Sequence, residues 1–209
     1  MPQFDLFDQN QNTIMGASTY PEFKTNLAKS NCAKCRLSEK RTNIVVDRGN
    51  PNTKILVVGE GPGENEDLQG KAFVGRAGQL LDEIMKSINL DTNKDMLIAN
   101  VVKCRPPENR APLKDEVDTC FPYLLKQIDL VKPKIILILG ATALKHMIKE
   151  KKEFSMEEEA GKFFESPDYP GIKLMVLYHP AYLLYDPRKK KNMWEHVKLL
   201  QTKLREITV

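Results

Sequence analysis

The sequence lacks the long apolar segments of a membrane protein and the leader of a secreted one. No apolar run among its 209 residues approaches the roughly eighteen that a membrane-spanning helix needs. The first part of the chain has no apolar stretch of the kind found in a signal peptide, so we expect a cytoplasmic protein without a membrane partner. No internal repeat is present, and we expect a flexible tail over residues 1–18 followed by one domain over residues 19–209.

The chain also lacks a strong excess of charge of one sign. Its 32 basic and 28 acidic residues give a net charge of +4, which permits nucleic-acid binding without requiring it. Basic residues nevertheless gather at Arg188–Lys191 and around the third cysteine, at Lys103, Arg105 and Arg110. Either cluster is a solvated surface or a set of phosphate contacts, and composition does not decide between the two.

Cysteine is scarce, and its few positions are informative. The four cysteines form a Cys-x2-Cys pair followed by two distant single residues, at Cys32, Cys35, Cys104 and Cys120. This spacing predicts that two separate parts of the chain meet at one metal site, where thiolates favour zinc or an iron–sulfur cluster. A disulfide framework is the alternative, and it is disfavoured by the lack of a secretory segment. Spacing alone leaves the choice of metal open.

Four continuous apolar runs indicate buried strands, and helical patterns separate them. The runs span residues 54–59, 96–102, 134–139 and 173–177. Strands that alternate with helices predict an α/β fold, here a three-layer α/β/α sandwich with a central, mainly parallel four-stranded sheet. In such folds ligands collect at the carboxyl ends of the strands, so functional residues are expected there.

Three segments at these strand ends carry polar or glycine-rich chemistry. The first run ends in G-E-G-P-G at residues 59–63, whose glycines allow a ligand to approach the backbone closely. The pattern of a phosphate-binding P-loop is absent. Asn100 offers a donor and an acceptor for the edge of a base, and His179, followed by Pro180, is placed to contact a ligand. Each segment alone also fits a structural turn, a buried amide or a structural histidine.

Together these segments resemble the family 4 uracil-DNA glycosylases. The resemblance rests on residues 59–63 with Glu66, Asp67 and the F-V-G segment at 73–75, on N-V-V-K-C-R-P-P at 100–107 and on H-P-A-Y-L at 179–183. It covers about residues 25–207 and implies an α/β/α fold with a [4Fe–4S] cluster on the four cysteines. It also implies an enzyme that flips uracil out of single- or double-stranded DNA and hydrolyses its N-glycosidic bond, leaving an abasic site. We expect it to act as a monomer and without a lyase step.

The resemblance assigns roles to the pocket residues. Phe73 is expected to stack on the flipped uracil, and Asn100 to pair with its O4/N3 edge. The main chain of Gly59, Glu60 and Gly61 supplies further hydrogen bonds. His179 is expected to donate to uracil O2 as negative charge develops on the leaving base. Glu60 is the second catalytic candidate. The best-known uracil-DNA glycosylases carry a water-activating Asp in this motif, whereas this chain has Glu60, which is expected to contribute mainly through its position in the pocket wall.

Further residues are expected to select the base and to hold the DNA. Glu66 would guard the C5 edge of uracil against the methyl group of thymine. Leu183 and Leu184 are either core residues or wedges at the tip of a loop after His179. As a wedge, one of them would fill the space vacated in the base stack. Phosphate contacts are expected from Arg188, Lys189 and Lys190.

Two departures and two alternatives complete the sequence-based picture. The segment between Cys104 and Cys120 contains no His. The branch of the superfamily that cross-links itself to DNA carries a His-containing insert in this region, so we expect this chain to turn over rather than to stay covalently bound to DNA. Gln3–Phe7 resembles the short peptide by which bacterial repair proteins bind the sliding clamp, with Phe4 in place of the usual Leu. The alternatives are a glycosylase for a wider range of deaminated bases and a non-catalytic DNA-binding module.

Overall fold

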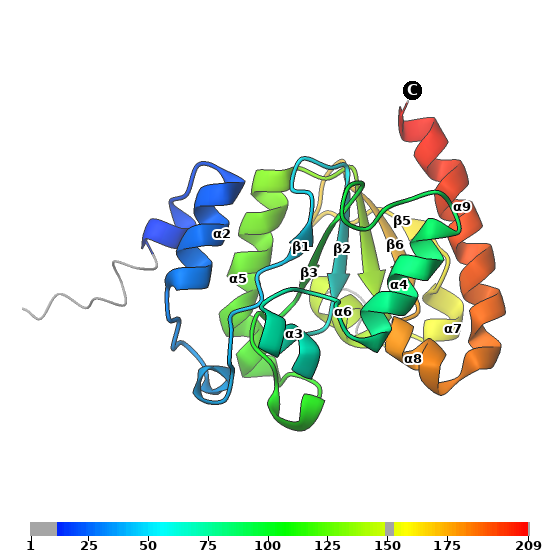
Figure 1. Ribbon diagram of the computed structural model, residues 1–209. Coiled ribbons are helices and arrows are strands. Elements are labelled where there is room, and N and C mark those ends of the chain that lie inside the picture. Colours follow the sequence, from blue (N-terminus) through cyan, green and yellow to red (C-terminus); the bar gives the residue numbers. More distant parts are fainter. Residues whose placement is uncertain (1–11, 149–152, 209) are drawn as a thin grey trace, which may run out of the picture.

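A six-stranded sheet forms the centre of the molecule (Figure 1). The computed structural model describes residues 12–148 and 153–208, and its strands follow the order β1-β3-β2-β4-β6-β5. The four inner strands run parallel, and they are β3 (Leu97–Asn100), β2 (Ile55–Gly59), β4 (Ile135–Leu139) and β6 (Lys173–Leu177). Each lies within one of the predicted apolar runs. The predicted α/β class is confirmed.

The sheet has six strands rather than the predicted four. The additional strands β1 (Arg48–Gly49) and β5 (Phe163–Phe164) form the two edges and pair antiparallel with β3 and β6. Each has only two residues, which is too short to show either alternation or a continuous apolar run. Their pairing is therefore visible only in three dimensions.

Helices cover both faces of the sheet, as the alternation of strands and helices predicts. One face packs against α2 (Tyr20–Lys29), α5 (Lys114–Val131) and α6 (Gly140–Met147), through side chains that include Leu56 and Val58. The other face packs, through Ile55 and Val57, against α4 (Arg76–Lys86), α8 (Pro180–Tyr185) and α9 (Lys190–Thr208). Figure 1 shows α2 and α5 on one side of the strands and α4 and α9 on the other.

The helix α2 begins directly after a capping residue, Thr19. The Thr19 hydroxyl accepts a hydrogen bond from the Glu22 amide at 3.4 Å, which satisfies one of the free amides of the first turn. Ile14 and Ala17, which the sequence analysis assigned to the tail, are both buried against this part of the core. Hydrophobic packing therefore already includes residues before position 19.

Shorter helical segments connect these elements. They are η1 (Arg36–Glu39), α3 (Glu64–Gln69), η2 (Pro107–Asn109), α7 (Met156–Glu159) and η3 (Pro187–Lys189). Both α3 and η2 lie near the carboxyl ends of β2 and β3 (Figure 1). Within the described ranges, no helix has the length and apolar character needed to cross a membrane.

Candidate functional site

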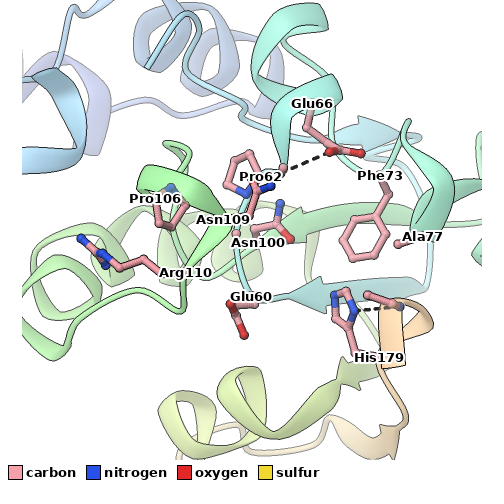
Figure 2. Close-up of a pocket in the computed structure, with 13 residues that line it drawn as sticks. Glu60, Pro62, Glu66, Phe73, Ala77, Asn100, Pro106, Asn109, Arg110 and His179 are labelled. Atoms are coloured by element: carbon pink, nitrogen blue, oxygen red, sulfur yellow. Dashed lines mark hydrogen bonds between the residues drawn. The ribbon is translucent and has the colours of Figure 1, made fainter. Parts of the chain in front are cut away.

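A pocket of about 430 Å³ opens at the carboxyl ends of the parallel strands (Figure 2). Three strands converge on it: β2 ends at Gly59, β3 ends at Asn100, and His179 follows β6. This is the edge at which the parallel topology predicts a ligand. The pocket is lined by Glu60, Gly61, Pro62, Gly63, Glu66, Phe73, Ala77, Asn100, Pro106, Asn109, Arg110, His179 and Ala181.

Asn100 presents an unsatisfied amide to this pocket. The residue is only 1% exposed, and neither Oδ1 nor Nδ2 has a hydrogen-bond partner among the described residues. Its backbone is fixed, because the Lys103 ammonium donates to the Asn100 carbonyl at 2.8 Å. A buried polar group without a partner costs roughly 1–3 kcal/mol. A ligand edge that carries one donor and one acceptor would remove this cost.

Phe73 supplies a flat apolar wall beside that amide. Its side chain is buried, and the centroid of its ring lies 5.7 Å from that of His179. A Cβ atom added at Gly59 would lie 2.6 Å from Phe73 Cζ and 2.6 Å from Asn100 Oδ1. Glycine is therefore needed at position 59, because only it allows the ring and the amide to approach the end of β2 so closely.

His179 is held as a neutral hydrogen-bond donor. It caps α8, and its Nδ1 atom accepts a hydrogen bond from the Ala181 amide at 3.2 Å. Desolvation of the imidazole lowers the pKa of His179 to about 4, although the nearby Glu66 charge acts in the opposite direction. With Nδ1 occupied as an acceptor, the neutral ring carries its proton on Nε2. The ring borders the pocket next to Phe73 in Figure 2.

Two carboxylates line the pocket on opposite sides (Figure 2). Glu60 directly follows β2 and is half-buried. Glu66, in the first turn of α3, accepts hydrogen bonds from the backbone amides of Gly63, Val74 and Gly75. The two side chains are therefore not equivalent, because the oxygens of Glu66 are bound to the backbone of two pocket loops.

The segment after His179 is a helix rather than the predicted loop, and this separates its two leucines. Leu183 is fully buried in α8 and packs into the core between the sheet, α4 and α9. The prediction that Leu183 could lie at a loop tip is therefore wrong. Leu184 is 36% exposed and Tyr185 is 87% exposed, so the outer surface of α8 presents Leu184 instead.

The predicted phosphate-binding residues lie at the surface just beyond α8. Arg188 donates to both carboxylate oxygens of Asp186, and Lys189 forms an ion pair with Glu157. Lys190 is exposed at the first position of α9. Surface ion pairs of this kind are worth about 0–1 kcal/mol, so the paired cations remain able to exchange a carboxylate for a phosphate.

Lys103, which the sequence places in the second basic cluster, does not face solvent. It is 1% exposed, and its ammonium donates to the Asn100 carbonyl and to Gln127 Oε1. Burial lowers the pKa of Lys103 to about 8. The side chain thus supports the end of β3 from inside the fold and cannot contact DNA.

The four cysteines come together at one small cavity. Cys32 and Cys35 precede η1, Cys104 follows β3 and Cys120 lies in α5, and all four are free thiols that line this cavity. Burial raises the pKa of Cys104 to about 11 and that of Cys120 to about 12, so both are neutral thiols unless a metal binds them. The predicted meeting of two distant segments is therefore present.

N–H groups already point at two of these sulfurs. The Lys103 amide donates to Cys120 Sγ at 3.3 Å, and Arg41 Nη1 donates to Cys104 Sγ at 3.4 Å. Within residues 12–148 and 153–208, no group of three or more His, Cys, Asp and Glu side chains is placed to hold one metal ion. The four thiols instead line one small cavity. Four cysteine thiolates are the usual ligand set of an iron–sulfur cluster.

The side of the pocket formed by η2 and its flanks was not predicted from the sequence. Pro106, Asn109 and Arg110 line the pocket, and Arg110 makes a bidentate ion pair with the buried Glu116. Asn109 has a positive φ of 56°. The adjacent prolines at 106 and 107 signal a turn, but nothing in the pattern shows that this turn folds over the pocket.

Comparisons with known proteins agree with this arrangement. The family model of the uracil DNA glycosylase superfamily matches residues 46–201. A type-4 uracil-DNA glycosylase of Sulfurisphaera tokodaii is 42% identical over 182 residues, which cover 85% of this chain and 80% of the relative. One of Thermotoga maritima is 45% identical over 73% of this chain and 78% of its own length. A type-5 enzyme of Pyrobaculum aerophilum is 26% identical over 78% of this chain and 82% of its own length. The chain therefore belongs to the type-4 uracil-DNA glycosylases of this superfamily.

Proposed function

We propose that this protein excises uracil from DNA by hydrolysing the N-glycosidic bond, and that it leaves an abasic site without a lyase step. The observation that carries the proposal is the unsatisfied amide of Asn100, which faces a pocket walled by Phe73 and His179. The names and identities of the relatives support the same reaction. An enzyme of this kind must first extract the base from the stack, at a cost of a few kcal/mol.

The pocket is complementary to the polar edge and the face of uracil. Asn100 Oδ1 accepts from N3–H and Nδ2 donates to O4, which satisfies both atoms that have no partner among the described residues. Phe73 stacks on the pyrimidine ring. The main chain of Gly59, Glu60 and Gly61 borders the base, where the small glycines keep the backbone accessible.

His179 stabilises the leaving base during bond cleavage. Its Nε2–H donates to uracil O2, where negative charge appears as the C1′–N1 bond breaks, so the interaction strengthens in the transition state. The Ala181 amide fixes the tautomer that makes this donation available. Because the pKa of His179 is lowered to about 4, the ring acts as a neutral donor and does not transfer a proton to the base.

Glu60 is the carboxylate available to the sugar side of the reaction. It follows β2 in the pocket wall, and its charge would stabilise the cationic sugar or orient the attacking water. Water attacks C1′ as the C1′–N1 bond breaks, and the electron pair of that bond remains on uracil. The attacking water loses one proton to solvent and becomes the C1′ hydroxyl, and the uracil anion takes up one proton from solvent. A Glu60→Gln variant tests the role of the charge, since it keeps the shape of the side chain.

The exposed surface next to α8 binds the DNA around the flipped nucleotide. Leu184 is the apolar side chain that enters the vacated space in the stack, because its neighbour Leu183 is fully buried. Arg188, Lys189 and Lys190 contact phosphates, which makes DNA affinity fall as the salt concentration rises.

We further propose that Cys32, Cys35, Cys104 and Cys120 hold a [4Fe–4S] cluster. Support comes from four free thiols around one cavity and from the N–H donors of Lys103 and Arg41 that face sulfur atoms. When bound, the cluster would supply a covalent cross-link between distant segments, with no open coordination site for the reaction. The buried Lys103 connects this region to Asn100, because its amide donates to Cys120 Sγ and its ammonium donates to the Asn100 carbonyl.

The remaining assignments concern partners and organisation. We propose that residues 19–209, together with Ile14 and Ala17 that pack against their core, form a single domain that acts as a monomer on DNA. The clamp-binding segment Gln3–Phe7 lies outside the described residues and remains a prediction. Comparing clamp affinity of the full chain with that of a chain lacking residues 1–8 tests it directly.

The reaction is tested with a labelled oligonucleotide that contains one uracil. Incubation followed by alkaline treatment should cleave the strand at uracil, whereas omission of alkali should leave it intact if no lyase step occurs. The Asn100→Ala and His179→Ala variants should lose most of this activity while they remain folded. Strand cleavage without alkali would contradict the monofunctional assignment, and binding without excision would favour the non-catalytic module.

A further inference from the structure

The carboxylate of Glu66 links two loops of the pocket. Its Oε1 atom accepts hydrogen bonds from the Val74 and Gly75 amides, both at 2.7 Å, and Oε2 accepts from the Gly63 amide at 3.2 Å. Hydrogen bonds from N–H groups to an ionised carboxylate are about twice as strong as neutral ones. Both oxygens are therefore occupied by the backbone, Oε1 by the loop after Phe73 and Oε2 by the loop before α3.

The two amides bound by Oε1 directly follow Phe73, whose backbone is strained. Phe73 has a φ of 54°, in the left-handed region that a bulky residue rarely adopts. Such a conformation persists only where the surroundings enforce it. The helix α4 lies directly against the Phe73 backbone, because a Cβ atom added at Gly78 would lie 1.8 Å from the Phe73 carbonyl oxygen.

Glu66 itself is held in place by the residue that follows it. Asp67 is 3% exposed and accepts hydrogen bonds from the Thr42 amide at 2.9 Å and from the Asn43 amide at 3.3 Å. These contacts fix α3 against the chain that leads away from η1. The hydrogen bonds from Val74 and Gly75 to Glu66, which we call the Glu66 clamp, therefore start from a helix that is itself held in place.

We infer that Glu66 is a positioning residue, which holds the strained backbone at Phe73 so that the ring stands ready to stack on the base. The inference rests on the proposed function for its effect on excision, but the clamp is a property of the fold. It differs from the expectation that Glu66 excludes thymine by meeting its methyl group. A carboxylate with three backbone N–H partners acts through the loop that it holds.

A double-mutant cycle tests whether Glu66 acts through Phe73. Glu66→Gln keeps the shape but replaces one acceptor by an NH₂ group, which faces an N–H donor in either orientation. We expect kcat/KM on uracil DNA to fall about tenfold or more in the wild-type background. In the Phe73→Ala background the same substitution should change it less than about twofold. Glu64→Gln, an exposed change in the same helical turn, is the matched control and should have no effect.

Two further measurements separate the alternatives. Glu66→Ala should lower uracil excision without any gain on thymine, whereas new thymine excision would show direct exclusion of the methyl group and overturn the inference. Equal losses in both Phe73 backgrounds would also overturn it. Amide hydrogen exchange at Val74 and Gly75 should accelerate in Glu66→Gln but not in Glu64→Gln. This readout needs no activity, so unchanged exchange refutes the clamp, while an inactive wild type refutes only the proposed reaction.

Discussion

The strongest prediction concerns the protonation state of His179 and the pH dependence that follows. At a pKa of about 4, roughly 97% of the imidazole is neutral at about pH 5.5, whereas an ordinary pKa of 6.5 would leave about 9% neutral. Protonation would place an Nδ1–H donor against the Ala181 amide, which now donates to that atom. The neutral form is therefore the one that matches the site.

The assay is the single-turnover excision rate on a short uracil oligonucleotide, measured from about pH 5 to pH 8. We expect no loss of rate that titrates near the ordinary pKa of histidine. The reasoning would be refuted by a roughly tenfold fall between pH 7.5 and pH 5.5 that is absent from His179→Gln. His146 and His196 are the only other histidines and are present in both proteins, so their contributions cancel.

The lowered pKa of His179 also makes the unfolding free energy depend on pH. Because the folded pKa of His179 lies below its unfolded value, the unfolded chain binds the proton more readily between pH 6.5 and pH 4. The contribution of neutral His179 to the unfolding free energy is fully present above about pH 6.5 and is lost as pH falls toward 4. Between about pH 7.5 and pH 5 it amounts to about 2 kcal/mol of unfolding free energy. Urea unfolding of wild type and His179→Gln at both pH values should show this difference.

Four further substitutions give distinct expected results. Asn100→Ala should lower kcat/KM on uracil about a hundredfold or more, in steady-state assays, because the donor and acceptor for the base are lost. Leu183→Ala should lower the unfolding free energy by about 2–5 kcal/mol in urea titrations, because it opens a cavity in the core. Leu184→Ala should leave stability unchanged and slow excision from double-stranded DNA more than from single strands. Loss of stability in Leu184→Ala, with slower excision in a stable Leu183→Ala, would contradict the assignment of Leu184 as the wedge. Cys104→Ala should remove iron and visible absorbance and lower the melting temperature, whereas a stable, colourless and fully active protein would refute a structural cluster.

The sheet was predictable where the sequence repeats one chemical type over several residues. Runs such as 134–139 are apolar throughout because parallel strands are buried on both faces, and their order along the chain fixes the α/β class. The edge strands β1 and β5 were not predictable, since a two-residue pairing leaves no pattern. The burial of Leu183 beside the exposed Leu184 was not predictable either, because two adjacent leucines look alike until α8 is packed.

The pocket was predicted less completely than the sheet. Asn100 and His179 were identified because they follow buried strands and match family motifs, and both line the pocket. The backbone contacts of Glu66 and the burial of Lys103 were missed. Charged side chains are ordinarily solvated, so a sequence pattern does not reveal one that instead binds the backbone inside the fold.

The most direct test of the account is excision from paired oligonucleotides that differ only in one base, uracil or thymine. The account predicts alkali-dependent cleavage at uracil, none at thymine, and a loss of about 10²–10³ in rate for His179→Ala. Cleavage that persists at the wild-type rate in His179→Ala, or a wild-type protein that binds uracil DNA without cleaving it, would contradict the central claim.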